Sequence, residues 1–537
     1  MAYWRDLRHF LEELGRRGKL ARWPTPIDKD TELMPLYRLQ FQGLGESDWR
    51  AFLFEAVTDA KGRRYDMTVA PGCYGASEEI FAWGMGCDNV GQINEKWHHS
   101  VNHPIEPVII NSGPVQEEVH LGSEIQELGL DELPAPVEEP GFSGSIRTTT
   151  PWITRDPETG IRNMGCYSGH FRGPDRIQCG VNPVSQGILH HWPSARKRNE
   201  KSLPVAITVG ITPNLVIAGC TKVPYGVDEL AVAGAIAGEP VELVRCKTVP
   251  LEVPANAEIV IEGLISTEIR EPYTAFGEYP GYMMGENWST PIMKVTAVTH
   301  RRNAIFTPIV VGMSPGDANL IGRLCNEMMM YEALKYRSQL PIEEVYYHVM
   351  GGGMNFLTIR MKKGYPSEPW DILHTASGVN PACKVIIVVD EDINPKDLDM
   401  VVWALSFSMQ PYEDTQVIRN RVARLDPSGA LPSHQGDPQE AFPGRQGTSA
   451  ILIDATRKKL YPPVGLPKRE YMERALRLWE QSEMPKLKLH TPWHGYHLGR
   501  WSEDAEENAQ LLVHGEYRKL GEKMAKRQTP VLDPKPW

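Results

Sequence analysis

The sequence lacks the features that mark a membrane, secreted or nucleic-acid-binding protein. No run among the 537 residues approaches the roughly 18 apolar residues of a membrane span. The opening MAYWRDLRHFLEELGRRGKL is amphipathic and charged throughout, so we expect no secretory leader. A formal charge of −11 argues against a face for nucleic acid or anionic membrane. We therefore expect a cytoplasmic protein with no nucleic-acid or membrane partner.

Paired cysteines and familiar catalytic motifs are also missing. The eight cysteines are dispersed without a CxxC pair, which disfavours a disulfide scaffold or a zinc–thiolate site. WGMGCDNVG and MGGGMNF are glycine-rich, but WGMGCDNVG does not fit GxGxxG, and MGGGMNF is better explained as a flexible turn. The histidine clusters KWHHSVNHP and HTPWHGYHLG do not give HExxH, so we expect interface packing or a substrate lid there.

The chain is long enough for two or three domains. From about Thr148 to Val311, short apolar runs separated by Gly, Pro and Asn turns predict a barrel or sandwich. After Pro315, strand-like and helical stretches alternate, which predicts a parallel α/β layer. Two peripheral helices are predicted around Arg469–Ser482 and Glu503–Lys526. The strand-like runs of the middle segment include PWITRD, LPVAITVGI, NLVIAGC, AEIVIEGLI and AIFTPIVVG, and the helical VDELAVAGAIAG interrupts them.

Hard oxygen ligands gather in the middle segment. GIRNMGCYSGHF places Asn163 beside a Gly-Cys-Tyr-Ser turn, and the backbone amides of Cys166, Tyr167 and Ser168 could face a phosphate. Glu229 lies in the first turn of a helix rich in small residues. Amide and carboxylate oxygens suit Mg²⁺, Mn²⁺ or K⁺ bridging a phosphate, not zinc. Either residue taken alone is more often a cap.

One acid stands in an unusual setting. The stretch EIREPYTAFGEYPGYMMGE places Glu278 between Gly277 and a Tyr-Pro-Gly turn. The carboxylate is either a charge on a surface loop or a catalytic acid in a hydrophobic pocket.

Several blocks resemble the UbiD family of (de)carboxylases, and the likeness covers nearly the whole chain. It implies a split β-barrel that binds prenylated FMN, and a flavin prenyltransferase that supplies this cofactor. It also implies a divalent cation (Mn²⁺, Mg²⁺ or Fe²⁺) at the flavin phosphate, with K⁺ as a further candidate. The blocks are TRDPETGIRNMGCYS, LPVAITVGITP, VDELAVAGAIAGEPVELVRCKTVPLEVPANAEIVIEG, AFGEYPGY and IIVVDEDINPKDLDMVVWAL.

The resemblance and the patterns together predict an α+β and α/β multidomain fold. We expect an N-terminal α/β domain at 1–125, the flavin-binding split barrel at 126–315 and an α/β domain at 316–465. A helical tail at 466–537 would serve oligomerisation or as a lid, and the family forms homodimers or homohexamers.

The sequence matches some of the family's metal ligands but not all of them. The family's asparagine and glutamate ligands match Asn163 and Glu229. The histidine ligand, 23 residues after the asparagine, is replaced by Gln186, while His190 and His191 lie nearby but out of register. The resemblance thus implies a cofactor site that includes Gln186 together with Cys166–Ser168.

The catalytic network departs further from the family. Its arginine, five residues after the asparagine, is Ser168 here, and its first acid is Tyr273. The second acid remains as Glu278, and the expected lysine before LIDAT reads Ser449-Ala450. The resemblance implies that Glu278 protonates the carbon from which CO₂ leaves, with Tyr273 as a hydrogen-bond donor or second proton path.

Loss of the arginine suggests a substrate that is anchored in another way. We expect an aryl-CoA carboxylate such as phthaloyl-CoA, whose phosphates could meet the basic ARKRNEK at Ala195–Lys201, although that segment also fits a solvated helix face. The alternatives are a free aromatic or heteroaromatic acid, or a catalytically degenerate flavin-binding subunit.

Overall fold

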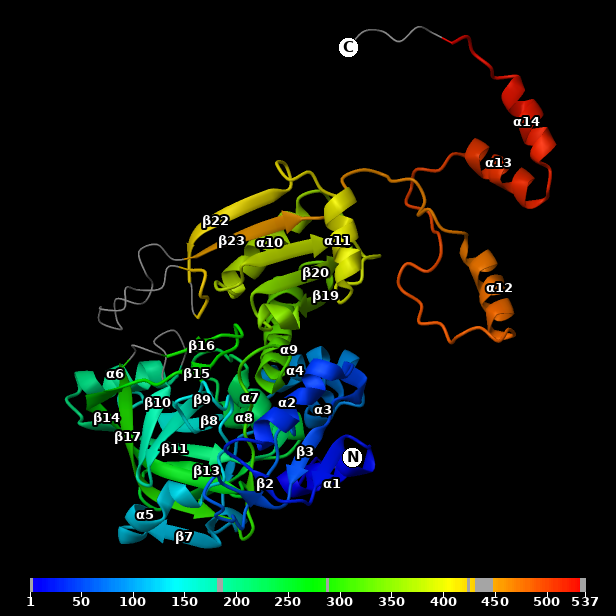
Figure 1. Cartoon of the computed structure of the whole chain (residues 1–537). Helices are drawn as coiled ribbons and strands as arrows, with labels where there is room; N and C mark the ends of the chain where they lie inside the picture. The colour runs from blue at the N-terminus through cyan, green and yellow to red at the C-terminus, as the bar shows by residue number, and fades with distance from the viewer. Residues whose placement is uncertain (1–2, 181–186, 286–288, 423–424, 430–447, 532–537) are drawn as a thin grey trace. The chain divides into compact units, whose positions relative to one another are not determined.

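The computed structural model describes residues 3–180, 187–285, 289–422, 425–429 and 448–531 (Figure 1). They form two compact units, Met1–Glu391 with Asp414–Asp454, and Asp392–Glu413 with Ala455–Trp537. Within the described ranges, no helix combines the length and the apolar character needed to cross a membrane.

A six-stranded antiparallel barrel forms the middle of the first unit, and it confirms the predicted barrel. The strands are hydrogen-bonded in the order β10-β9-β8-β11-β14-β17, and β10 pairs again with β17 to close the ring. Closure removes open sheet edges. The short β7 (Glu118–Leu121) adds a strand beside β17. The barrel strands are β8 (Arg147–Arg155), β9 (Arg162–Gly173), β10 (Arg176–Gly180), β11 (Ser202–Val209), β14 (Ile259–Pro272) and β17 (Ser289–His300).

The barrel strands carry apolar side chains on both of their faces. In β11, Leu203, Val205 and Ile207 belong to one buried cluster, whereas Ala206 belongs to another. Successive side chains of a strand point to opposite faces, so apolar residues at both parities bury both faces of the sheet. The barrel is therefore packed on its two sides rather than exposed on one.

The N-terminal part combines a small sheet with helices. Its strands run in the order β1-β3-β5-β18, and β18 (Ile305–Phe306) returns to this sheet after the barrel. Helix α1 (Leu7–Arg16) buries the apolar face seen in the sequence, and Asp6 caps its first turn. The remaining strands and helices are β1 (Leu20–Trp23), β3 (Ala51–Phe54), β5 (Thr68–Val69), α2 (Leu33–Gly43), α3 (Glu78–Gly84), α4 (Ile93–Asn102) and α5 (Ser123–Glu127).

Two of the predicted strands are wrong. NLVIAGC forms helix α7 (Pro213–Cys220), with a proline at its start, and it packs against α8 (Glu229–Ala237). A run that is buried all round has no periodicity to separate a helix from a strand, which explains this error. AIFTPIVVG contributes only the two residues of β18.

A five-stranded α/β sheet follows the barrel. The order is β19-β20-β21-β23-β22, in which β20, β21 and β23 are parallel, as predicted. The elements are α9 (Asp317–Tyr331), β19 (Ile342–Tyr347), β20 (Phe356–Met361), α10 (Glu368–Val379), β21 (Val385–Val389), β22 (Thr415–Arg421) and β23 (Thr448–Asp454).

The second unit is helical and contains the predicted peripheral helices. The helix predicted at Arg469–Ser482 is α12 (Arg469–Glu480), and the region predicted at Glu503–Lys526 holds α13 (Glu503–Val513) and α14 (Tyr517–Ala525). The unit also contains α11 (Leu398–Phe407). The single helix expected at Glu503–Lys526 is instead divided into two helices, because the chain turns at Gly515, whose φ is +74°.

Candidate active site

Strand β9 carries four of the predicted site residues, Asn163, Cys166, Tyr167 and Ser168. The turn expected here is wrong, since these residues stay in antiparallel register with β8. Alternation places Asn163 and Tyr167 on one face of the strand, and Cys166 and Ser168 on the other. One strand therefore serves two sides of the candidate site.

The edge of β9 that turns away from β8 presents backbone donors. The N–H of Met164 donates to Glu229 Oε2 at 3.0 Å, so this amide points toward α8. Alternation of the backbone places the amide of Cys166 on the same edge. Pro151 lies opposite Cys166 in β8 and has no N–H to donate, as expected for such a pair.

A cavity of about 300 Å³ joins the predicted metal ligands. Asn163 and Glu229 line it together with Gly187, His190 and His191. Gln186 lies outside the described residues. The structure thus places the predicted asparagine and glutamate at one cavity, with two histidines beside them.

The chemistry of this cavity fits a divalent cation. Burial raises the pKa of Glu229 to about 7, so a nearby cation would be needed to keep it fully ionised. Burial lowers the pKa of His191 to about 4, which keeps its imidazole neutral. His191 Nδ1 lies 2.8 Å from Thr154 Oγ1, and its buried Nε2 has no partner among the described residues. An amide, a carboxylate and a neutral imidazole suit Mn²⁺ or Fe²⁺.

Gly187 allows Asn163 to occupy this cavity. Its φ is +79°, and a Cβ there would lie 2.1 Å from Asn163 Oδ1. Only glycine adopts this positive φ readily and also leaves room for the Asn163 side chain.

Glu278 lies on the tight loop between β15 (Phe276–Gly277) and β16 (Met283–Met284). Its side chain is half-buried, and the N–H of Tyr279 donates to its Oε2 at 3.0 Å. Burial raises the pKa of Glu278, while Arg147 opposes that rise. A carboxyl with a raised pKa can hold a proton near neutral pH and give it to a reacting atom.

Arg147, at the start of β8, is a residue that sequence reasoning missed. It is 2% exposed, and its Nε and Nη2 donate to the two oxygens of Glu138 at 2.9 and 2.7 Å. Nη2 also donates to the carbonyl of Gly277 at 2.8 Å. From the other side, the N–H of Gly277 donates to Glu139 Oε2 at 3.2 Å. This clamp fixes the residue before Glu278.

An aromatic wall stands beside the loop. The ring centroid of His170 lies 4.6 Å from that of Tyr273 and 4.9 Å from that of Phe276. Burial keeps the pKa of the Tyr273 phenol well above its usual range, so the hydroxyl stays protonated and able to donate. His170 is fully buried, and neither ring nitrogen has a partner within the described ranges. Burial also holds its pKa well below the ordinary value.

Small residues occupy the two positions where the family has an arginine and a lysine. Ser168 Oγ lies 2.9 Å from Thr149 Oγ1, and Ser449 and Ala450 lie in β23. Four residues beyond Ser168 on the same face, Arg172 is half-buried and donates from Nη2 to Thr274 Oγ1 at 3.0 Å.

Arg172 forms no ion pair with a carboxylate in the part of the chain that the structure describes. Burial lowers the pKa of its guanidinium, and the nearby Tyr273 and Glu271 offset this effect only in part. This guanidinium beside Tyr273 is thus able to receive an anion.

Comparisons with known proteins agree on a single family. The 3-octaprenyl-4-hydroxybenzoate carboxy-lyase Rift-related domain (UbiD) matches residues 108–314, and the corresponding C-terminal domain matches residues 319–455. An uncharacterized protein of Aquifex aeolicus (strain VF5) is 30% identical over 482 residues, covering 85% of this chain and 92% of that protein.

Solved structures of the same class superpose over most of the chain. The UbiD-class enzyme HmfF from Pelotomaculum thermopropionicum, in an evolved dimeric form with prFMN, is 27% identical with a TM-score of 0.74, covering 88% of this chain and 99% of that one. A 3,4-dihydroxybenzoic acid decarboxylase from Enterobacter cloacae is 26% identical with a TM-score of 0.73, covering 91% and 98%. The chain therefore belongs to the UbiD family of carboxy-lyases.

Proposed function

We propose that the protein decarboxylates an aromatic carboxylate with prenylated FMN, using Glu278 as the proton donor. One observation supports this most directly: the predicted oxygen ligands Asn163 and Glu229 lie at one end of β9, and the half-buried Glu278 lies beside the other end. Prenylated FMN, when bound, supplies the dipolar carbon centre that lets an unsaturated carboxylate lose CO₂. Bound prFMN in the HmfF relative supports the cofactor.

The spacing along β9 matches the length of such a cofactor. Five residues separate Asn163 from Ser168, a span of roughly 17 Å at about 3.3 Å per residue. Asn163 and Glu229, with His191 or Gln186 as a third ligand, would hold the cation at the phosphate. The open edge at Cys166 would donate to phosphate oxygens. Tyr167, whose hydroxyl lies 3.5 Å from Asn163 Nδ2, would line the cation end, and Ser168 would line the ring end.

The protein's own groups account for proton delivery. Protonated Glu278 gives its proton to the carbon from which CO₂ departs, and its half-buried position lets water reprotonate it. Tyr273, whose hydroxyl stays protonated, would donate a hydrogen bond to the substrate. The clamp from Arg147 holds the loop in place, so the acid need not be ordered during the reaction.

Arg172 favours a free aromatic or heteroaromatic acid as the substrate. A guanidinium without a carboxylate partner can bind a carboxylate through two parallel hydrogen bonds. Its place on the same face as Ser168 lets it replace the family arginine that Ser168 lacks. The relatives that act on 3,4-dihydroxybenzoic acid and vanillic acid support this substrate class.

An aryl-CoA carboxylate such as phthaloyl-CoA is the second candidate. It is supported by the basic segment Ala195–Lys201 at the end of helix α6 (Ile188–Lys197), in which Arg196, Lys197 and Arg198 are exposed. The same helix begins beside the cation cavity. We also propose a homo-oligomer, supported by the dimeric relative and by exposed apolar residues on α12–α14 such as Leu478 and Tyr517.

Co-expression with a flavin prenyltransferase tests the proposal. The purified protein should show a shifted flavin absorption and release CO₂ from members of a panel of aryl acids and their CoA esters. Colourless protein would contradict the cofactor assignment. Flavin-loaded protein that releases no CO₂ from the panel would instead identify a non-catalytic flavin-binding subunit.

A further inference from the structure

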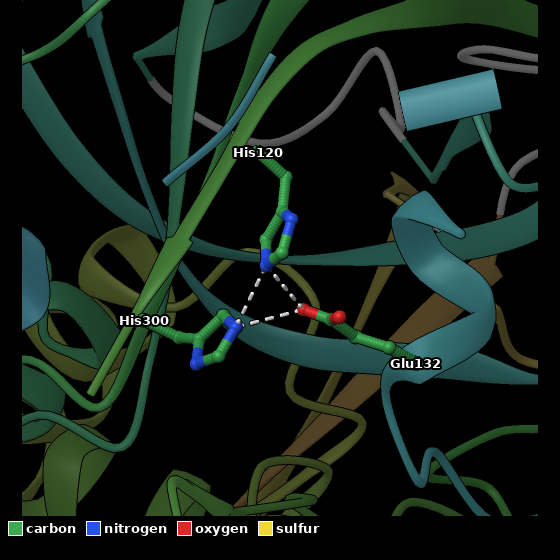
Figure 2. A group of neighbouring side chains, drawn as sticks. All are labelled: His120, Glu132 and His300. Carbon is green, nitrogen blue, oxygen red and sulfur yellow. Dashed lines mark hydrogen bonds and ion pairs between the residues drawn. The ribbon is translucent and has the colours of Figure 1, made fainter. Parts of the chain in front are cut away.

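Two histidines and a glutamate converge at the end of the barrel, far along the sequence from the predicted catalytic groups. His120 lies in β7, His300 ends β17, and Glu132 ends the short helix Gly129–Glu132. In the strand register His120 faces Val298, so His300 is its diagonal neighbour on the same face. Figure 2 shows the two ring nitrogens and one carboxylate oxygen pointing toward a common centre.

The separations of these atoms fit a tetrahedral metal. The Nε2 atoms of His120 and His300 are 3.3 Å apart, and Glu132 Oε1 is 2.9 Å from the second and 3.6 Å from the first. Two ligand atoms that each lie about 2.0–2.1 Å from a tetrahedral zinc are about 3.3 Å from one another. The triangle needs little adjustment to accept the ion.

The hydrogen bonds around the triangle orient the lone pairs inward. His300 Nδ1 lies 2.8 Å from the carbonyl of Arg301, and it must donate because a carbonyl only accepts. In neutral His300 the lone pair of Nε2 then faces Glu132 Oε1, a buried oxygen that accepts no well-aligned hydrogen bond from the described residues. Two lone pairs at this distance repel unless a proton or a metal cation lies between them. A backbone carbonyl behind a ligating histidine is also the usual outer support of a metal site.

We propose that His120, Glu132 and His300 bind one Zn²⁺ ion that fastens β7 and the segment before the barrel to strand β17. Two imidazoles and a carboxylate are a ligand set that zinc accepts, with a fourth position open to water. Mg²⁺ and K⁺ prefer oxygen ligands, so this site differs in selectivity from the cavity at Asn163 and Glu229. The exposed Glu124 lies 3.8 Å from His120 Nδ1 and can orient that ring from outside.

The bound ion would cross-link β7 to the barrel. Among the residues that the structure describes, β7 pairs with the barrel only through residues 297–300 of β17, and it is a short strand outside the closed ring. An ion held by β7, the helix ending at Glu132 and β17 would add a cross-link that the ladder alone does not give. Because the folded chain would bind zinc more tightly than the unfolded chain, zinc should raise the melting temperature.

Metal analysis and cobalt spectroscopy on untagged full-length protein test this proposal. The protein carries Glu229→Gln, so that the cavity at Asn163 cannot contribute. After treatment with chelator, it should take up one equivalent of Zn²⁺, and Co²⁺ in its place should give the visible absorption of a tetrahedral site. Since loss of an outer-shell partner costs about 10–100-fold in metal affinity, His120→Asn and Glu132→Gln should each weaken zinc binding at least about 100-fold. His374→Gln, an exposed histidine on α10, is the matched control and should bind as the parent does.

Far-ultraviolet circular dichroism checks that each variant is folded. His120→Asn changes a half-exposed side chain, and Glu132→Gln keeps the size of the side chain, so at least one should retain the fold. A parent protein that takes up no zinc beyond the level of these variants would overturn the proposal, as would cobalt spectra of an octahedral ion. The assay does not involve prenylated FMN or turnover, so its outcome is independent of the proposed decarboxylation.

Discussion

Arg147 donates from Nη2 to the carbonyl of Gly277 at 2.8 Å, which ties the first strand of the barrel to the loop that holds Glu278. On its other side, the same guanidinium donates from Nε and Nη2 to the two oxygens of Glu138. The cation therefore fixes the position of this loop, and it also opposes the rise that burial causes in the pKa of Glu278.

The clamp should contribute strongly to stability. Arg147 and Glu138 are each about 2% exposed at the side chain, and removing one partner of a buried ion pair costs about 3–5 kcal/mol, because the other charge stays buried. Arg147→Met should lower the free energy of unfolding by this amount in urea titrations. The double variant Glu138→Gln with Arg147→Met should recover a large part of the loss, and equal losses in the single and double variants would contradict the pairing.

Turnover should fall as pH rises through the raised pKa of Glu278. The proton donor is the protonated carboxyl, which is present below the folded-state pKa and lost above it. Because Arg147 lowers this pKa, Arg147→Met should move the falling limb of kcat/KM to higher pH, while Arg147→Lys should leave it near its original place. A limb that shifts downward in the methionine variant would contradict the electrostatic assignment.

Arg172→Gln should distinguish the two substrate classes. If Arg172 binds the free carboxylate, the variant should raise KM for free aryl acids about tenfold or more, since a charge-assisted hydrogen bond contributes about 1.5–3 kcal/mol. Arg176→Gln, an exposed arginine on β10, serves as the control. If the protein acts only on CoA esters, and Arg172→Gln leaves KM for those esters unchanged, the thioester class is supported instead.

Gly187→Ala should weaken cofactor binding without unfolding the barrel. The added Cβ would lie 2.1 Å from Asn163 Oδ1 and would displace this predicted ligand. Gly160→Ala is a close control, because Gly160 has a similar φ of +73° but open space around its Cβ position. Flavin retained after gel filtration should fall in the first variant and persist in the second. Equal retention in both would argue against Asn163 as a ligand.

The sequence predicted those parts of the molecule that depend on local pattern. Short apolar runs separated by Gly, Pro and Asn turns indicated the barrel strands, and the FGE stretch singled out Glu278. The run NLVIAGC misled, because residues buried on all sides look alike in a helix and in a strand.

Arg147 could not be found from the sequence, since its role comes from contacts with Glu138 and Gly277 across 9 and 130 positions. Glu138 and Glu139 lie in the proline- and acid-rich stretch LDELPAPVEEPGFSGS, whose local pattern indicates no such contact. Only the fold brings these carboxylates to the loop that holds Glu278. His170 and Arg172 were likewise hidden, because their partners come from the segment after β14.

The most direct test of the account is the turnover of Glu278→Gln, compared with the parent at equal prenylated FMN content on the best substrate of the panel. The account predicts a loss of about 10²–10⁴-fold in product formation, the usual contribution of a positioned general acid. In D₂O, the parent should place deuterium at the carbon that lost CO₂. Glu268→Gln, an exposed acid in the same stretch, should retain parental activity. Full turnover by Glu278→Gln would contradict the assignment of Glu278 as the proton donor.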